Sequence, residues 1–213
     1  EKNFISGRGR DLPAMMAKRY GEIVNVADFV RKAQMMNYEG YRAMYEGRLG
    51  QMYNPVEGVL TWMSHPAQPS LVWQIYHYDM DQHASFFATK KACQQVHIQF
   101  NEIEDGIIQV VNHQPDQISG AYSKLTIYNL DGSVALQDKY DVSASPCSVN
   151  KVCNVQWPAS LTPVHFIKLE LYGSTGNLIS DNFYWRGSAP DPTDLSSLET
   201  MPVVKLSTKA KVR

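Results

Sequence analysis

The sequence predicts an α/β segment followed by an all-β, immunoglobulin-like sandwich within one chain of 213 residues. Three observations support this prediction. Residues 12–48 carry apolar side chains at helical spacing, and residues 58–79 combine a short apolar run with a proline-rich loop. From about residue 95 onward, short runs of alternating apolar and polar residues are separated by Asp-Gly and Gly-rich turns. The composition therefore changes from helical to β-type near Val96.

Two helices are expected at the beginning of the chain. Asp11 is suited to cap a short helix over residues 12–20, and Gly21 is suited to end it. Asn25 is suited to cap a longer helix that runs to about Arg48. The residues at three- and four-residue steps along that helix predict one apolar face: Phe29, Ala33, Met36, Gly40 and Met44.

The stretch that follows is the first candidate for a functional site. Gly58 to Met63 is rich in apolar and β-branched residues, which predicts a buried strand. Pro66 and Pro69 cannot continue that strand because proline lacks the ladder donor. Polar and aromatic groups gathered just past the end of a buried strand are typical of sites in α/β barrels. The alternative is that the tryptophans here, Trp62 and Trp73, belong to the core.

A third helix is expected over about residues 83–94, and after it seven strands are expected. The strand-like runs are residues 96–100, 107–111, 124–128, 134–142, 152–157, 165–172 and 178–185. Phe166, Leu169 and Leu171 cannot share one face by strict alternation, so a bulge or a strand buried on both faces is predicted there. Trp157 and Trp185 lie within strand patterns and are expected to pack in the core or against the helical part.

Composition excludes several classes of protein. A content of 44% hydrophobic and 19% charged residues indicates a packed core and no long disordered region. The net charge of -1 provides no basic surface for a nucleic acid, and the apolar runs are too short for a membrane helix of ~20 residues. Cys147 and Cys153 either form a disulfide in an oxidising compartment or remain free thiols, and no Cys/His spacing predicts a metal site.

Three segments of the sequence resemble a known family. The helical segment Lys32-Ala-Gln-Met-Met-Asn-Tyr38 and the segment Trp73-Gln-Ile-Tyr76, together with Gly58-Val-Leu-Thr-Trp-Met63, resemble glycoside hydrolase family 2. Within it, the sequence is most similar to exo-β-glucosaminidases and endo-β-mannosidases. The resemblance implies a modular enzyme that contains a (β/α)8 barrel followed by β-sandwich domains.

The resemblance also implies a domain organisation. Residues 1–94 correspond to the C-terminal segment of the (β/α)8 catalytic barrel, and residues 95–187 correspond to the immunoglobulin-like sandwich. Residues 188–213 correspond to a linker, Pro-rich at its beginning, and the start of a further β-domain. We therefore expect the chain to be a segment of a longer protein, whose remaining segments are its partners. The family favours a secreted, periplasmic or lysosome-like compartment over the cytoplasm.

The resemblance assigns a substrate-binding role to one loop. Trp62 matches the tryptophan that ends the eighth barrel strand and forms a platform under the sugar, whose C–H face stacks on an aromatic ring. Ser64, His65, Gln68 and Trp73 are the other substrate-binding candidates. No catalytic residue is assigned, because the two carboxylates of the family precede this segment. Asp79 and Asp81 are expected to cap turns or the third helix.

The predicted function is part of a retaining β-glycoside hydrolase that acts on β-linked oligosaccharides, without a cofactor or metal. The chain alone is expected to be inactive, because it lacks the carboxylate pair that such hydrolysis requires. The alternative function is a non-catalytic sandwich that binds carbohydrate or acts as a spacer. The sequence of this segment does not determine whether the sugar is glucosamine or mannose.

Overall fold

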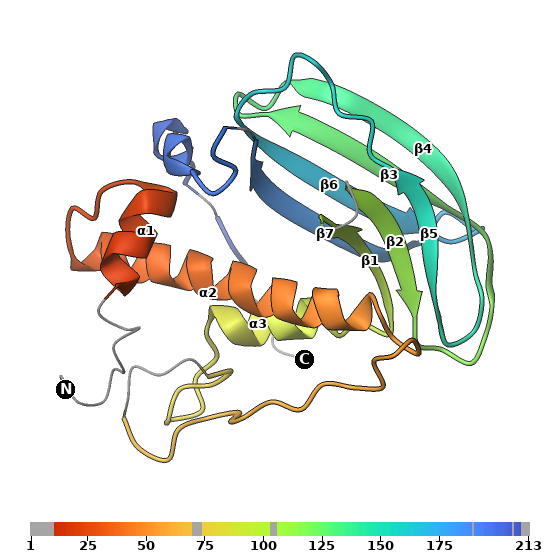
Figure 1. Ribbon diagram of the computed structural model, residues 1–213, viewed down its shortest axis with the longest axis horizontal. Coiled ribbons are helices and arrows are strands. Elements are labelled where there is room, and N and C mark those ends of the chain that lie inside the picture. The colour runs from red at the N-terminus through yellow and green to blue at the C-terminus, as the bar shows by residue number, and fades with distance from the viewer. Residues whose placement is uncertain (1–10, 70–73, 103–105, 189, 206, 210–213) are drawn as a thin grey trace.

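The computed structural model describes residues 11–69, 74–102, 106–188, 190–205 and 207–209. It contains a helical layer beside a sandwich of two β-sheets (Figure 1). The helices are α1 (Leu12–Tyr20), α2 (Val26–Leu49) and α3 (Ala84–Ala92). Helix α2 runs along the sandwich, and the loop between α2 and α3 lies on the side of these helices that is away from the sheets.

The seven predicted strands are all present and form two antiparallel sheets. The first sheet has the order β1-β2-β5 and the second has the order β4-β3-β6-β7. The strands are β1 (Val96–Asn101), β2 (Ile107–Asn112), β3 (Ile118–Asn129), β4 (Val134–Ala144), β5 (Ser148–Asn154), β6 (Val164–Tyr172) and β7 (Leu178–Gly187). This arrangement confirms the β-sandwich.

The core of the sandwich lies between the two sheets, where Ile98, Val110, Leu125 and Leu169 are fully buried. Strand β6 is buried on both faces along its first four residues, and its register with β7 shifts after Leu171. The predicted irregularity of β6 is therefore confirmed. Strand β1 is also buried on both faces, where alternation predicted only one, because α2 covers its outer face.

Helix α2 begins as predicted, since the side chain of Asn25 accepts a hydrogen bond of 2.9 Å from the backbone N–H of Asp28. Its buried face differs from the prediction. Met44 is 45% exposed, while the residues buried along the helix include the charged side chains Lys32, Arg42 and Glu46. Hydrophobic periodicity missed this face because the helix contacts the sandwich mainly through polar groups.

The predicted strand over residues 58–63 is wrong. These residues form an irregular extended segment, and Leu60 and Trp62 project into solvent. A strand needs a neighbour that accepts and donates its ladder hydrogen bonds. Among the described residues no such neighbour lies beside this segment, so the α/β part of the chain consists here of helices and loops.

The segment after β7 packs on α1. Leu195 is fully buried, and its backbone N–H donates a hydrogen bond of 2.6 Å to the carbonyl of Arg19. The short 3₁₀ helix η2 (Ser196–Thr200) places Glu199 against the buried ammonium group of Lys32. The ammonium group also donates to the carbonyl of Glu22 at 2.6 Å. These contacts attach the C-terminal segment to the helical layer.

Of the two alternatives for Cys147 and Cys153, the structure has the free thiols. Cys153 lies in β5 and Cys147 immediately precedes it. Six residues of extended chain span about 20 Å, whereas the Cα atoms of a disulfide lie within about 7 Å. Strand β5 thus holds the two cysteines apart.

Substituting Cys147 with serine should therefore leave stability unchanged. Cys147 is exposed, and surface substitutions of this kind change the free energy of unfolding by less than about 0.5 kcal/mol. We expect equal melting temperatures for Cys147→Ser and the parent protein under non-reducing conditions. A lower melting temperature for the variant, abolished by dithiothreitol, would contradict the free thiols.

His165 on β6 makes stability depend on pH. The side chain is buried, and burial lowers the pKa of His165 below its usual value of 6.5. The unfolded chain then binds a proton more readily than the folded one, so stability is present above pH 6.5 and is lost as the pH falls below it. We expect the melting temperature to fall from about pH 7 to about pH 5, and to fall less in His165→Phe. Some slope will remain in that variant, because the pKa of His83 and that of His113 are lowered by burial too.

Candidate functional site

A pocket of about 360 Å³ lies between α2 and the irregular segment before Ser64. Trp62 forms one wall and is 87% exposed, so its ring is available for contact. The other walls are formed by one face of α2 and by the three residues that precede Trp62 in the sequence. The lining residues are Asn37, Gly40, Tyr41, Met44, Val59, Leu60, Thr61 and Trp62.

The segment that carries Trp62 is attached on both sides of that residue. The hydroxyl of Tyr45 on α2 lies 2.5 Å from Oγ1 of Thr61. The carbonyl of Ser64 accepts hydrogen bonds of 3.0 Å from the backbone N–H groups of Ile75 and Tyr76. The backbone around Trp62 is therefore fixed while its indole remains exposed.

The other predicted site residues lie beyond this pocket. Oγ of Ser64 is 3.4 Å from Nδ1 of His65, and both side chains are exposed. Gln68 is exposed as well, and none of the three lines the pocket. Trp73 lies outside the described residues. The structure thus brings Ser64 and His65 together but does not join them to the pocket wall.

A polar cluster next to the pocket was not predicted. Nδ2 of Asn37 lies 3.3 Å from Nδ1 of His83, and Oγ of Ser85 donates a hydrogen bond of 2.5 Å to the carbonyl of Gln74. The ring of His77 stacks on that of His83 at 4.7 Å between centroids. Burial, with His77 beside it, lowers the pKa of His83 below its usual value. The one available signal was the position of Asn37, one helical turn before Tyr41 on the same face.

Asp79 and Asp81 have the turn-capping role that the sequence predicts. Oδ1 of Asp79 accepts a hydrogen bond of 3.2 Å from the N–H of Asp81, and Oδ1 of Asp81 accepts one of 2.9 Å from the N–H of Gln82. Neither carboxylate lines the pocket beside Trp62. In the described part of the chain, no group of three or more His, Cys, Asp or Glu side chains is arranged to hold a metal ion.

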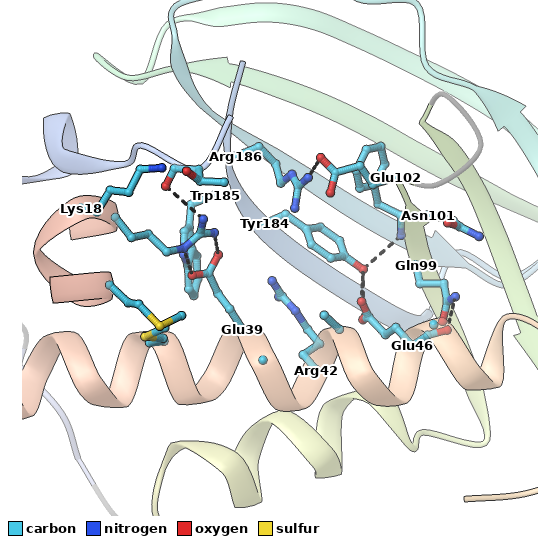
Figure 2. Close-up of a pocket in the computed structure, with 18 residues that line it drawn as sticks. Lys18, Glu39, Arg42, Glu46, Gln99, Asn101, Glu102, Tyr184, Trp185 and Arg186 are labelled. Carbon is cyan, nitrogen blue, oxygen red and sulfur yellow. Dashed lines mark hydrogen bonds and ion pairs between the residues drawn. The ribbon is translucent and has the colours of Figure 1, made fainter. Parts of the chain in front are cut away.

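A second cavity, of about 710 Å³, lies between α2 and the sandwich (Figure 2). The guanidinium of Arg42 lies 4.2 Å from the ring centroid of Tyr184 and 5.5 Å from that of Trp185. Nη1 of Arg42 donates a hydrogen bond of 2.5 Å to the carbonyl of Phe183. This arrangement attaches the middle of α2 to strand β7.

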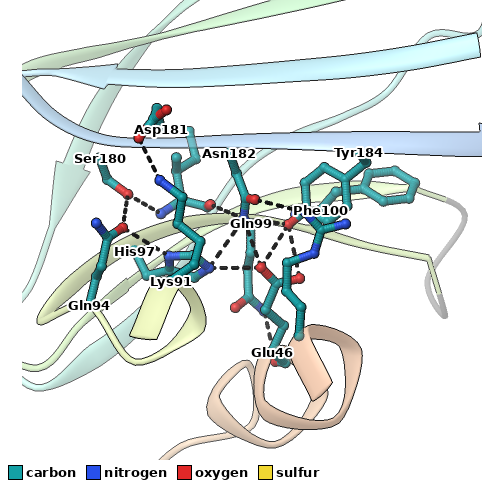
Figure 3. A network of polar contacts seen from close by, with 12 residues as sticks. Glu46, Lys91, Gln94, His97, Gln99, Phe100, Ser180, Asp181, Asn182 and Tyr184 are labelled. Atoms are coloured by element: carbon teal, nitrogen blue, oxygen red, sulfur yellow. Dashed lines mark hydrogen bonds and ion pairs between the residues drawn. The ribbon is translucent and has the colours of Figure 1, made fainter. Parts of the chain in front are cut away.

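Glu46, one turn further along α2, is the centre of a buried polar network (Figure 3). Its Oε1 accepts hydrogen bonds from Nδ2 of Asn182 at 2.7 Å, from Nε2 of His97 at 2.9 Å and from the hydroxyl of Tyr184 at 3.0 Å. Burial, with the carboxylate beside it, holds the pKa of Tyr184 well above its usual value. The tyrosine therefore stays protonated and donates. The cavity and the network lie where the helix meets the sandwich. Trp185 stacks on Tyr38 of α2 there, as expected of a residue that packs against the helical part, but the polar network itself was not predicted.

Comparison of the sequence with characterised proteins finds similarity to glycosidases. It is 35% identical over 191 residues to an exo-β-D-glucosaminidase of Streptomyces avermitilis, a match that covers 85% of the chain and 21% of the relative. It is 33% identical over 170 residues to a mannosylglycoprotein endo-β-mannosidase of Lilium longiflorum, covering 78% of the chain and 18% of the relative. The chain thus spans about a fifth of the length of these relatives. No protein-family model matches it.

Solved structures agree with the sequence relatives. The exo-chitosanase of Amycolatopsis orientalis is 28% identical with a TM-score of 0.82, over 88% of the chain and 24% of that enzyme. A β-D-mannosidase of Dictyoglomus thermophilum is 16% identical with a TM-score of 0.71, over 87% of the chain and 22% of that enzyme, which establishes similarity of fold alone. None of the helices in the described residues is long and apolar enough to cross a membrane. The chain is thus similar to one segment of exo-β-glucosaminidases and β-mannosidases, in agreement with the resemblance to glycoside hydrolase family 2.

Proposed function

We propose that this chain is part of a retaining β-glycoside hydrolase of the exo-β-glucosaminidase or β-mannosidase type, acting on β-linked oligosaccharides. In this proposal it contributes a sugar-binding platform and no catalytic carboxylate. The single observation that carries the proposal is the indole of Trp62, 87% exposed on a fixed backbone at the edge of a pocket. A sugar ring stacks its C–H face on such a surface at little entropic cost.

The lining of the pocket supports a binding role over a chemical one. Retaining hydrolysis needs two carboxyl groups about 5 Å apart. Among the described residues that line the pocket beside Trp62, none is an acid or a histidine. The amide of Asn37 and the hydroxyl of Thr61 are instead groups of the kind that hydrogen-bond sugar hydroxyls. The carboxylates are then supplied by the rest of the enzyme.

Exposed apolar side chains on the α2–α3 loop and on α3 support the proposal that another segment of the enzyme packs there. Three large apolar side chains in the loop between α2 and α3 are at least two-fifths exposed: Leu60, Met63 and Met80. Phe87 on α3 is exposed to a similar extent. Large apolar side chains that are exposed along one stretch of chain favour a surface that another segment covers. We propose that residues 1–94 complete a (β/α)8 barrel with preceding segments of the same enzyme, and that residues 95–187 and 188–213 are the following sandwich and the start of a further domain.

The exposed face of the sandwich gives less support to the alternative, a carbohydrate-binding module. Tyr122 and Tyr172 stack on each other on the outer face of the four-stranded sheet, at 5.1 Å between centroids. The ammonium of Lys139 lies 4.0 Å from the ring centroid of Tyr122, and that of Lys124 lies 5.0 Å from that of Tyr172. Both rings thus have cationic partners already, which leaves them less available to a sugar.

The proposal is tested by hydrolysis assays. The 213-residue chain alone should hydrolyse neither p-nitrophenyl β-D-glucosaminide nor p-nitrophenyl β-D-mannoside. The whole protein that contains it should hydrolyse one of them, with retention of configuration at the anomeric carbon. Hydrolysis by the isolated chain would contradict the platform role, and no hydrolysis by the whole protein would contradict the proposed activity.

A further inference from the structure

Helix α2 contacts the sandwich and the Trp62 segment through two adjacent residues. Glu46 is bound by strands β1 and β7, and Tyr45 is bound to Thr61. We propose that the sandwich positions Trp62 through α2, and that Glu46 and Asn182 are positioning residues of the hydrolase. This inference rests on the proposed function, because it concerns the placement of the same sugar platform.

The sandwich fixes the position of Glu46 from two sheets. His97 belongs to the three-stranded sheet, whereas Asn182 and Tyr184 belong to the four-stranded sheet. All three donate to the same carboxylate oxygen within 3.0 Å (Figure 3). Since the donors approach from different strands, α2 cannot slide or rotate without breaking a buried hydrogen bond, which is costly.

Arg42 provides a second attachment one turn earlier on α2. Its Nη1 donates to the carbonyl of Phe183 at 2.5 Å and to Oδ1 of Asn182 at 3.3 Å. Asn182 therefore contacts both Arg42 and Glu46, and it joins two consecutive turns of the helix to β7. Two attachments on one strand fix the direction of the helix as well as its position.

Tyr45, the residue before Glu46 on α2, carries this position to the platform. The hydroxyl of Tyr45 is bound to Thr61, the residue that precedes Trp62, and Asn37 and Tyr41 line the same pocket. Because a helix is stiff over one turn, a displacement of Glu46 displaces Tyr45 by a similar distance. The connection runs from Asn182 through Glu46, Tyr45 and Thr61 to Trp62, and each step is a covalent link between neighbours or a hydrogen bond shorter than 3 Å.

A double-mutant cycle in the whole protein tests the connection. Asn182→Ala removes the one side chain that contacts both Arg42 and Glu46 and so loosens α2 on the sandwich, and Tyr45→Phe removes the hydrogen bond between α2 and Thr61. We expect each variant to lower kcat on the p-nitrophenyl glycoside that the protein cleaves about tenfold with KM nearly unchanged, since a misplaced sugar loses its reactive geometry. Because the two contacts act in series, the double variant should lose no more than the worse single variant.

Asp181→Ala is the matched control. Asp181 precedes Asn182 on β7 and binds Lys91 of α3 at 2.6 Å, so it joins the same two layers without touching α2. We expect its kcat to equal that of the parent protein. Losses that add in the double variant, an unchanged kcat in folded Asn182→Ala, or an equal loss in Asp181→Ala would each overturn the inference.

A second readout separates this inference from the proposed activity. The amides of Ile75 and Tyr76 report on the Trp62 segment, because both donate to the carbonyl of Ser64. Their hydrogen exchange should be faster in Asn182→Ala and unchanged in Asp181→Ala. If the whole protein hydrolyses neither glycoside, the proposed activity fails, and the exchange rates alone decide the positioning: equal rates in Asn182→Ala and the parent protein overturn it.

Discussion

Replacing Trp62 with alanine in the whole protein is expected to lower kcat/KM for its β-glycoside about a hundredfold, because a sugar that loses its platform is misplaced relative to the carboxylates. Trp62 is 87% exposed in this chain and packs little against it, so the melting temperature should change only slightly. Steady-state kinetics and a melting curve on the same preparation measure both effects. The loss should be partly restored in Trp62→Phe, which keeps an aromatic face.

Trp157→Ala serves as the control for this prediction. Trp157 is the other largely exposed tryptophan among the described residues, and it packs edge-on against Phe100 and His165 in the sandwich. Its removal should lower stability through lost packing and leave kcat/KM unchanged. An unchanged kcat/KM in Trp62→Ala on both glucosaminide and mannoside substrates would refute the platform.

The sequence predicts the sandwich well because its signals are local. Alternation and turn residues identify a strand from its own few residues, as for residues 165–172 and strand β6. The start of α2 is predicted for the same reason, since Asn25 and its partner Asp28 are three residues apart. The ends of strands are less certain: β3 begins at Ile118, six residues before the predicted start.

The predictions that fail depend on distant partners. Residues 58–63 have the composition of a buried strand, yet a strand forms only beside another one, and the described residues provide none. The face of α2 was predicted from apolar spacing, while Arg42 and Glu46 are buried by partners more than fifty residues away. Periodicity does not identify a buried charge whose partner lies on another element.

The candidate site depends both on a local sequence signal and on a contact between distant segments. Trp62 came from resemblance to a family, and its exposure agrees with a role in binding. The second wall of its pocket, with Asn37 and Tyr41, was not predicted, because the residues of a helix face acquire a pocket only when another segment packs beside them. A linear motif thus identifies one wall of a site, and the fold determines the other.

The network around Glu46 should be the largest single contribution of a polar residue to stability. Its carboxylate is buried and accepts from His97, Asn182 and Tyr184, so its removal leaves three buried donors without this acceptor. We expect Glu46→Ala to lower the free energy of unfolding by about 3–5 kcal/mol. Urea denaturation of the 213-residue chain measures this change.

Glu46→Gln distinguishes the charge of Glu46 from its size. Glutamine fills the same volume, but its amide group presents two further donors to a site that already holds three. This variant should therefore be destabilised nearly as much as Glu46→Ala, which a simple packing role would not predict. Glu57→Ala removes an exposed carboxylate from the same chain and should change stability by less than about 0.5 kcal/mol. Equal denaturation midpoints for Glu46→Gln and Glu57→Ala would mean that the sandwich holds α2 by shape, and the hydrogen bonds to Glu46 would then contribute little to the fold.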